Sequence, residues 1–191
     1  PIKSSAASDV YKRQSRLCPR TEVSTHTALV QKLFDMVCQN EIDLLYFLDQ
    51  RTNFPEWVKV AERREQAFFV ASAESPLAGE KAIPLERLMG EAFLLTERGM
   101  SYRDALDQCM DAHHLALKPY IELGSAAMLA EMVERGMGLS FLPEYIVRKE
   151  LAAHRLARLN VPECQISMHR QLFYHRDKWL TPQMKAFVEL V

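Results

Sequence analysis

The chain has 191 residues, a formal net charge of −1 and a hydrophobic share of 48%. This composition is that of an ordinary globular domain, and it excludes a chain that is mostly disordered, collagen-like or coiled-coil. A free-standing nucleic-acid-binding domain would carry an excess of Lys and Arg, but here 24 basic side chains face 25 acidic ones, so we do not expect these residues to contact DNA.

The N-terminal segment PIKSSAASDVYKRQ, residues 1–14, does not join the pattern that follows. It is polar and has neither helical nor strand periodicity. We expect it to be a non-native addition or, alternatively, a native disordered leader. The interpretable fold then begins near Ser15.

The next stretch alternates between helical and strand-like patterns. Residues 27–39 place apolar side chains on one face of a predicted helix. The continuous apolar run Ile42–Leu48 has strand length and suits a buried parallel strand. Residues 66–72 and 92–96 predict two further strands, and Pro84 opens a short predicted helix that ends at Met89.

The middle of the chain continues this alternation. A helix is predicted over 101–115, with Ser101 and Asp104 spaced as a capping pair. A short strand follows at 120–123, and then a helix at 125–135 that Gly136 ends in a left-handed position.

The last part predicts a strand at 139–142, a helix at 143–153, a strand core at 171–174 and a helix at 181–190. Thr181 is expected to cap this last helix, with proline at its first position. Strands and helices alternate throughout, and this pattern indicates an α/β fold with mostly parallel sheets.

Four stretches of the sequence agree, in order and spacing, with a known family pattern. They are NEIDLLYFL (40–48), FFVASAESPLAGEKAIPLERLMGEAFLL (68–95), LAEMVERGMGLSFLPEYIVRKEL (129–151) and RQLFYHRDKWLTPQMKAFVEL (170–190). Together they resemble the effector-binding domain of LysR-type transcriptional regulators over residues 20–191. The helix-turn-helix, the linker helix and the first strand and helix of that family have no counterpart, so we expect an N-terminally truncated effector domain.

The resemblance implies a periplasmic-binding-protein-like fold of two α/β lobes joined by two crossing segments. We expect one lobe at 15–65 plus 144–191 and the other at 66–143. Phe141–Pro143 either form a crossing segment between the lobes or simply end a strand. The family dimerises through this domain, with tetramers also formed. The missing segment contributes to that surface, which argues against dimerisation of this stretch alone.

Three loops that precede predicted helices are candidates for effector binding, because ligands of α/β sheets bind beyond the carboxyl ends of strands. They are Thr25–Thr27, Glu97–Ser101 and Gly124–Ser125. Exposed N–H groups at helix starts favour an anion, and Arg98 can add a charge-assisted hydrogen bond. Ser or Thr at a single helix start is equally typical of a plain N-cap. The predicted effector-binding residues are Thr25, His26, Thr27, Arg98, Gly99, Met100, Ser101, Gly124, Ser125 and Phe141.

The Gly-Met-Gly run at 136–138 is not interpreted as a phosphate loop. It follows a predicted helix instead of opening one, so it does not match the dinucleotide-binding fingerprint. We expect Gly136 to end the helix and Gly138 to allow a tight entry into the next strand.

Neither catalysis nor a metal site is predicted. Cys109 and His113 share a helical face, but no third or fourth ligand has a recognisable spacing. No nucleophile–base or paired-carboxylate constellation can be assigned, so we expect no enzyme, no metal and no cofactor. In the peroxide-sensing branch of the resembled family a cysteine precedes this helix, where this chain has Ser101; the four cysteines are interpreted as ordinary thiols.

The leading hypothesis is a cytoplasmic sensing module that binds a small, anionic metabolite between its lobes and controls DNA binding by an absent helix-turn-helix. The alternative is an extracytoplasmic solute-binding protein of similar fold. That alternative needs a secretion signal upstream of residue 15, and no apolar signal core is visible. No run of about 18 apolar residues indicates a membrane span either.

Overall fold

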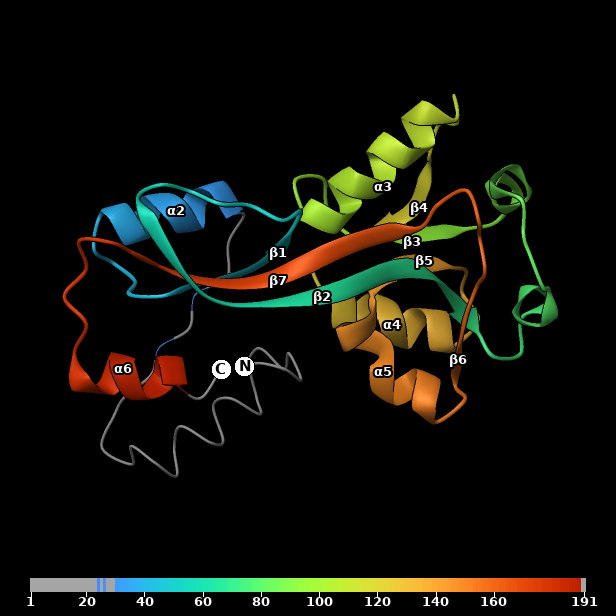
Figure 1. The fold of residues 1–191 in the computed structure, drawn as a ribbon. Coiled ribbons are helices and arrows are strands. Elements are labelled where there is room, and N and C mark those ends of the chain that lie inside the picture. Colours follow the sequence, from blue (N-terminus) through green and yellow to red (C-terminus); the bar gives the residue numbers. More distant parts are fainter. Residues whose placement is uncertain (1–23, 25, 27–29, 190–191) are drawn as a thin grey trace. The chain divides into compact units, whose positions relative to one another are not determined.

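The computed structural model describes residues 24, 26 and 30–189 (Figure 1). The expected leader at 1–14 lies outside these residues, as do Thr25 and Thr27. The chain divides into two compact units. Unit 1 contains the described residues up to Arg64 and those from His169 on, and unit 2 contains Glu65–Met168.

Both boundaries between the units fall inside strands, β2 (Trp57–Ser72) and β7 (Ile166–His175). These two strands are therefore the segments that cross from one unit to the other. The structure places the first crossing at 64/65, against the expected 65/66, but the second at 168/169 instead of 143/144. Phe141–Pro143 lies inside unit 2 and is not a crossing segment.

The second boundary differs from the expectation because residues 144–168 complete unit 2. Helix α5 (Glu144–Ala152) contacts α4, β5 and β6. Strand β6 (Leu156–Arg158) then pairs with β2 through Ser72↔Leu156 and Val70↔Arg158. Strand β6 was not predicted, because three residues are too few to show a periodicity.

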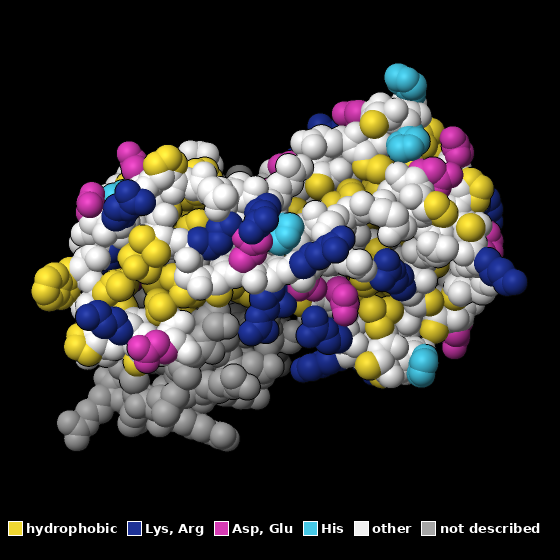
Figure 2. Space-filling view, in the orientation of Figure 1, with side chains coloured by type: hydrophobic (Ala, Val, Ile, Leu, Met, Phe, Trp, Pro, Cys, Tyr) yellow, Lys and Arg dark blue, Asp and Glu magenta, His cyan; other side chains and the backbone are white. Residues whose placement is uncertain are grey.

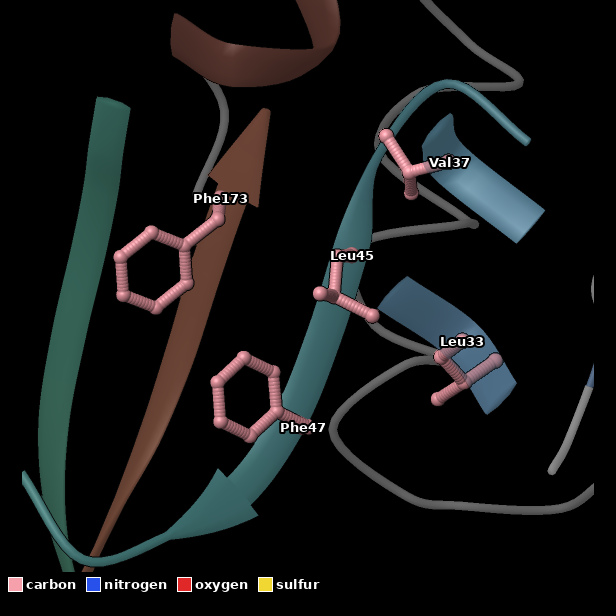
Figure 3. Close-up of a cluster of buried hydrophobic side chains, with 5 residues drawn as sticks. All are labelled: Leu33, Val37, Leu45, Phe47 and Phe173. Atoms are coloured by element: carbon pink, nitrogen blue, oxygen red, sulfur yellow. The ribbon is translucent and has the colours of Figure 1, made fainter. Parts of the chain in front are cut away.

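Unit 1 is built around helix α2 (Val30–Cys38) and strand β1 (Leu45–Asp49), which pairs antiparallel with β7. Its core consists of apolar side chains from α2, β1 and β7 that point toward one another (Figure 3). The rings of Phe47 and Phe173 stack with centroids 5.6 Å apart. These core residues are Leu33, Val37, Leu45, Phe47 and Phe173.

The last helix of unit 1, α6 (Pro182–Glu189), begins as predicted. The hydroxyl Oγ1 of Thr181 accepts a hydrogen bond from the N–H of Met184 at 3.2 Å. Because Pro182 needs no partner for a backbone N–H at the first helical position, this start is locally encoded.

Unit 2 contains most of the helices in the described part of the chain. After the second part of β2 its elements are η1 (Pro76–Gly79), η2 (Leu85–Gly90), β3 (Phe93–Leu95), α3 (Ser101–Ala112), β4 (Pro119–Glu122), α4 (Ala126–Glu134), β5 (Ser140–Pro143), α5 and β6. The largest fully buried side chains of this unit include Phe69, Leu94, Leu106 and Phe141. Phe69 and Phe141 meet edge to face at 5.1 Å between ring centroids.

The α/β class is confirmed, with a mixture of strand directions. In the larger sheet, β1 pairs antiparallel with β7, and β2 pairs antiparallel with β5 and β6. Parallel pairing is seen between β3 and β4, and at the bridge Phe93↔Leu139. A buried apolar run predicts a strand but not the direction of its neighbour, which explains why mostly parallel sheets were expected.

The Gly-Met-Gly run ends α4 and enters β5 as predicted. Gly136 has a φ of +75°, and its N–H bonds to the carbonyl of Val133 while that of Met137 bonds to Met132. This is a Schellman ending, which glycine favours. Gly138 has a φ of +149°, and a Cβ there would lie 2.2 Å from the carbonyl oxygen of Ala92. Only glycine fits this close approach.

Candidate functional site

Two of the three predicted loops follow neighbouring parallel strands of unit 2. β3 and β4 pair in the register Leu94↔Ile121 and Leu95↔Glu122, so their carboxyl ends lie at the same edge. The N–H of Leu123 continues the pairing by donating to the carbonyl of Leu95 at 3.1 Å. The loops that lead into α3 and α4 therefore lie side by side. We refer to residues 97–101 and 124–125 as the paired loops.

The second of the paired loops is short and capped. Ser125 Oγ accepts a hydrogen bond from the N–H of Met128 at 3.3 Å and so caps α4. The carboxylate of Glu97 lies over Gly124: a Cβ added to Gly124 would be 3.3 Å from Glu97 Oε1. Gly124, Ser125 and Glu97 are all exposed. The start of α4 is thus accessible, with one carboxylate beside it.

The first of the paired loops starts α3 differently from the prediction. The N-cap is Met100, which makes no side-chain capping bond, and Ser101 is the first helical residue. Asp104 Oδ1 instead accepts a hydrogen bond from the N–H of Gly99 at 3.0 Å. The prediction of Ser101 as the capping residue is therefore wrong, because the helix begins at Ser101 itself and Met100 is its N-cap. The negative charge of Asp104 also lies near the positive end of the helix, where it is favourable.

Arg98 is the cationic side chain of the paired loops. It is exposed, and its guanidinium forms no ion pair among the interactions of the described residues. The N-terminal ends of α3 and α4 add partial positive charge. The carboxylates of Glu97 and Asp104 act against them. The arrangement can bind a small polar group. An anionic group would be attracted by Arg98 and repelled by the carboxylate of Glu97.

A buried arginine, Arg103, holds α3 against the strands that lead into the paired loops. Its role was not predicted from the sequence. The Arg103 side chain is 1% exposed. Its Nη1 donates to the carbonyl of Thr96 at 2.6 Å and to Glu122 Oε2 at 3.3 Å, and its Nε donates to Asp107 at 2.9 Å. Its Nη2 is buried without a hydrogen-bond partner in the described structure. Arg103 thus joins α3 to the ends of β3 and β4.

The burial of Arg103 has no local signal in the sequence. Arg103 and Asp107 are four residues apart on a helix, and this spacing is typical of an exposed ion pair. Whether this arginine is buried or exposed depends on how closely α3 packs against the sheet. That packing involves residues that are distant in the sequence.

The other predicted site residues lie outside the paired loops of unit 2 or outside the described part of the chain. Phe141 is 1% exposed and packs against Phe69 in the core of unit 2. His26 is exposed and belongs to unit 1. Thr25 and Thr27 lie outside the described residues. Unit 2 brings together Arg98, Gly99, Met100, Ser101, Gly124 and Ser125.

A cavity of about 530 Å³ lies at the opposite end of α4. None of the predicted site residues lines it. Its walls come from the end of β2, η1, the end of α4 and the entry to β5. The lining residues are Ala71, Ser72, Glu74, Ser75, Pro76, Leu77, Glu91, Glu134, Arg135, Gly136, Gly138 and Leu139. Two of its glutamates are already paired, Glu91 with Arg87 and Glu134 with Arg155.

The described surface carries charges of both signs. On the face shown in Figure 2, Lys and Arg side chains are interspersed with Asp and Glu. No group of three or more His, Cys, Asp or Glu side chains is placed to hold a metal ion in the part of the chain that the structure describes. His113 Nδ1 lies 2.8 Å from the backbone carbonyl of Cys109. Across the same residues, no helix has the length and apolar character that a membrane span requires.

The sequence matches a known protein family over nearly its whole length. The model of the LysR substrate binding domain matches residues 4–191. The RuBisCO operon transcriptional regulator of Acidithiobacillus ferrooxidans is 31% identical over 157 residues, which are 82% of this chain and 50% of that protein. The HTH-type transcriptional activator CmpR of Synechocystis is 27% identical over 90% of this chain and 56% of its own length. The chain spans about half the length of such relatives.

Solved structures show the same fold. The regulatory domain of CcmR from Synechocystis PCC6803, in complex with 2-PG, matches with a TM-score of 0.79 and 22% identity, over 96% of this chain and 88% of its own. The effector-binding domain of QuiR, in complex with shikimate, has a TM-score of 0.75 and 14% identity, over 98% and 89% of the two chains. At these identities the likeness concerns the fold.

Proposed function

The chain belongs to the LysR substrate-binding domain family, and on this premise we propose that it senses a small anionic molecule for a transcriptional regulator. The effector binds at the paired loops of unit 2. The whole regulator binds DNA through a separate helix-turn-helix part and acts in the cytoplasm, where the DNA is. Its relatives are transcriptional regulators, and we assign it no catalytic activity.

The observation that supports this proposal most strongly is the juxtaposition of two helix starts at one sheet edge. Parallel pairing of β3 with β4 brings the start of α3 beside the start of α4. Arg98 is exposed there without an ion pair among the described residues. The partial positive charge of helix starts and an exposed guanidinium suit a carboxylate or phosphate.

A small acid also agrees with the solved structures of similar fold, which include complexes with 2-PG and with shikimate. Neither name identifies the effector of this chain. The chemistry of the paired loops indicates a compact molecule with an anionic group that contacts Arg98 and a neutral polar part that contacts Ser101 or Ser125.

Binding can control a regulator only if the effector has different affinities for two states of the protein. The paired loops are suited to this role because both lead directly into helices, α3 and α4. A ligand that orders the loops would favour the arrangement in which both helix starts face it. The free-energy difference between the two states then sets the size of the response.

The extracytoplasmic solute-binding alternative has no specific observation in its favour. The relatives that match 82–90% of this chain are transcriptional regulators. We therefore propose only the regulator function.

A direct test is a screen of small carboxylates and phosphates against the ¹⁵N-labelled chain by NMR. The proposal expects an acid whose addition shifts the amide signals of Gly99, Ser101, Gly124 and Ser125 before those of other residues. Lys118, an exposed residue just before β4, serves as an internal reference because it precedes the amino end of that strand. Shifts confined to the lining of the 530 Å³ cavity would overturn the proposed site.

A further inference from the structure

Two thiols lie together in unit 2, and neither belongs to the candidate effector site. Cys109 is on the last two turns of α3, and Cys164 follows β6 in a turn closed by its N–H to the carbonyl of Val161 at 3.1 Å. Both are free cysteines. Nothing in the sequence pairs them, because they are far apart in the chain.

The Cys109 thiol lies against the peptide unit that carries Cys164. Cys109 Sγ is 3.6 Å from the carbonyl oxygen of Glu163, and that carbonyl is bonded to the backbone nitrogen of Cys164. The two side chains also interact through a hydrogen bond between their thiols. Burial raises the pKa of the Cys164 thiol, and a hydrogen bond with the Cys109 thiol raises it further.

The two thiols differ in accessibility, and this difference assigns their order of reaction. Cys164 is 3% exposed, whereas Cys109 is partly exposed. A thiolate is the attacking species in thiol–disulfide exchange, so a reagent in solution meets Cys109 first. Cys164 is held beside it, out of solvent, where it can attack Cys109 Sγ once that sulfur is part of a mixed disulfide.

We propose that Cys109 and Cys164 form a reversible oxidation site that closes a disulfide between α3 and the turn after β6. A small-molecule disulfide such as oxidised glutathione is the oxidant. The Cys109 thiolate attacks one of its sulfurs, forms a mixed disulfide and releases one glutathione thiolate. Cys164 then loses its proton and attacks Cys109 Sγ, which releases the second glutathione. Both protein thiols are oxidised, and the oxidant is reduced to two thiols.

The bond would constrain unit 2. It joins two segments that are distant in sequence, so it reduces the conformational freedom of the unfolded chain. In a reducing cytoplasm the site stays reduced, and it closes only under oxidation. This inference does not rest on the effector proposal, since it concerns the end of α3 that is remote from the paired loops.

The test uses the full chain with Cys18→Ser and Cys38→Ser, which leaves only the proposed pair. Cys38 is exposed on α2, so its replacement should not disturb the core. After treatment with oxidised glutathione, we expect the intact mass to fall by two hydrogens. Peptide mapping should join the Cys109 and Cys164 peptides, and dithiothreitol should reverse the change. The same mapping on the unsubstituted chain provides a second measurement that needs no variant.

Single variants in this background separate the two roles. With Cys164→Ser, Cys109 should remain as the mixed disulfide with glutathione. With Cys109→Ser, Cys164 should stay unmodified because it is buried. The oxidised pair should raise the midpoint of thermal unfolding by about 5 °C or more. Four results would overturn the proposal. They are a pair that stays reduced, a reaction that stops at the mixed disulfide, a disulfide that links only separate chains, and a lower midpoint of thermal unfolding in the oxidised protein.

Discussion

The carboxylate of Glu97 lies over Gly124, so that a Cβ on Gly124 would be 3.3 Å from Glu97 Oε1. This contact joins the two paired loops, and it puts a negative charge beside the helix starts that are proposed to bind an anion. Glu97 therefore limits the affinity of the site while it covers the short second loop.

Replacing Glu97 by Gln should strengthen the binding of an anionic effector. The amide keeps the size of the side chain and removes the like charge, so we expect the dissociation constant to fall about 2- to 5-fold at low salt. Isothermal titration calorimetry with the acid found in the screen measures this. Glu131→Gln, on the exposed part of α4, is the matched control. Weaker binding by the Glu97 variant would mean that Glu97 contacts the effector itself.

Gly138→Ala should destabilise the protein far more than Gly136→Ala. Alanine at 138 meets the Ala92 carbonyl oxygen at 2.2 Å, whereas alanine at 136 meets nothing within 4 Å and faces only the strain of a positive φ. We expect a loss of about 1 kcal/mol of unfolding free energy at 136 and more than ~3 kcal/mol at 138. Urea denaturation compares the two. Equal losses of unfolding free energy in the two variants would contradict the close approach of Gly138 to Ala92.

Arg103→Met should destabilise unit 2, because methionine fills much of the space but donates no hydrogen bond. The carbonyl of Thr96 and the carboxylates of Asp107 and Glu122 would lose their donor. Because the two carboxylates are 30% and 40% exposed and can be hydrated, most of the expected loss of about 1–3 kcal/mol comes from the buried Thr96 carbonyl. Arg98→Met, at an exposed position of the same helix start, should change stability by less than ~0.5 kcal/mol. If both variants unfold at the same urea concentration, Arg103 does not support the loops.

Glu62 should titrate below an ordinary glutamate. A hydrogen bond from Lys59 lowers the pKa of Glu62 most. Desolvation, the next largest effect, raises it, and the charges of Lys59 and Arg51 lower it further, so that the pKa is lowered overall. A carboxyl whose folded pKa is lowered stabilises the fold above its unfolded pKa, and this contribution is lost as the pH falls through the folded pKa. NMR titration of the side-chain carboxyl, with Glu62→Gln for assignment, tests this. A pKa of Glu62 at or above the ordinary value of a glutamate would contradict it.

The parts of the fold with a local cause could be predicted from the sequence. Thr181 and Pro182 start α6, and Gly136 ends α4, as their residue types indicate. Strand direction and the second unit boundary could not be predicted, because they depend on which distant segment pairs with which. Strand β6 shows this: it pairs with β2 through residues more than eighty positions away.

The candidate site shows the same division. The loops at 97–101 and 124–125 could be found because each follows an apolar strand and precedes a helix. The roles of Arg103 and Glu97 could not, since their contacts cross between elements. Phe141 was placed in the site by its position in the family pattern, whereas β5 directs its ring into the core.

Calorimetric titration of three proteins tests the central claim most directly. The unsubstituted chain, Arg98→Ala and Lys118→Ala are each titrated with the acid that shifts the amides of the paired loops. Both substitutions remove one exposed cation, but only Arg98 lies in the paired loops. Loss of a charge-assisted hydrogen bond should weaken binding by Arg98→Ala about 10-fold or more, and Lys118→Ala should differ by less than about 2-fold. Equal affinities of all three proteins would contradict an anion site at the paired loops.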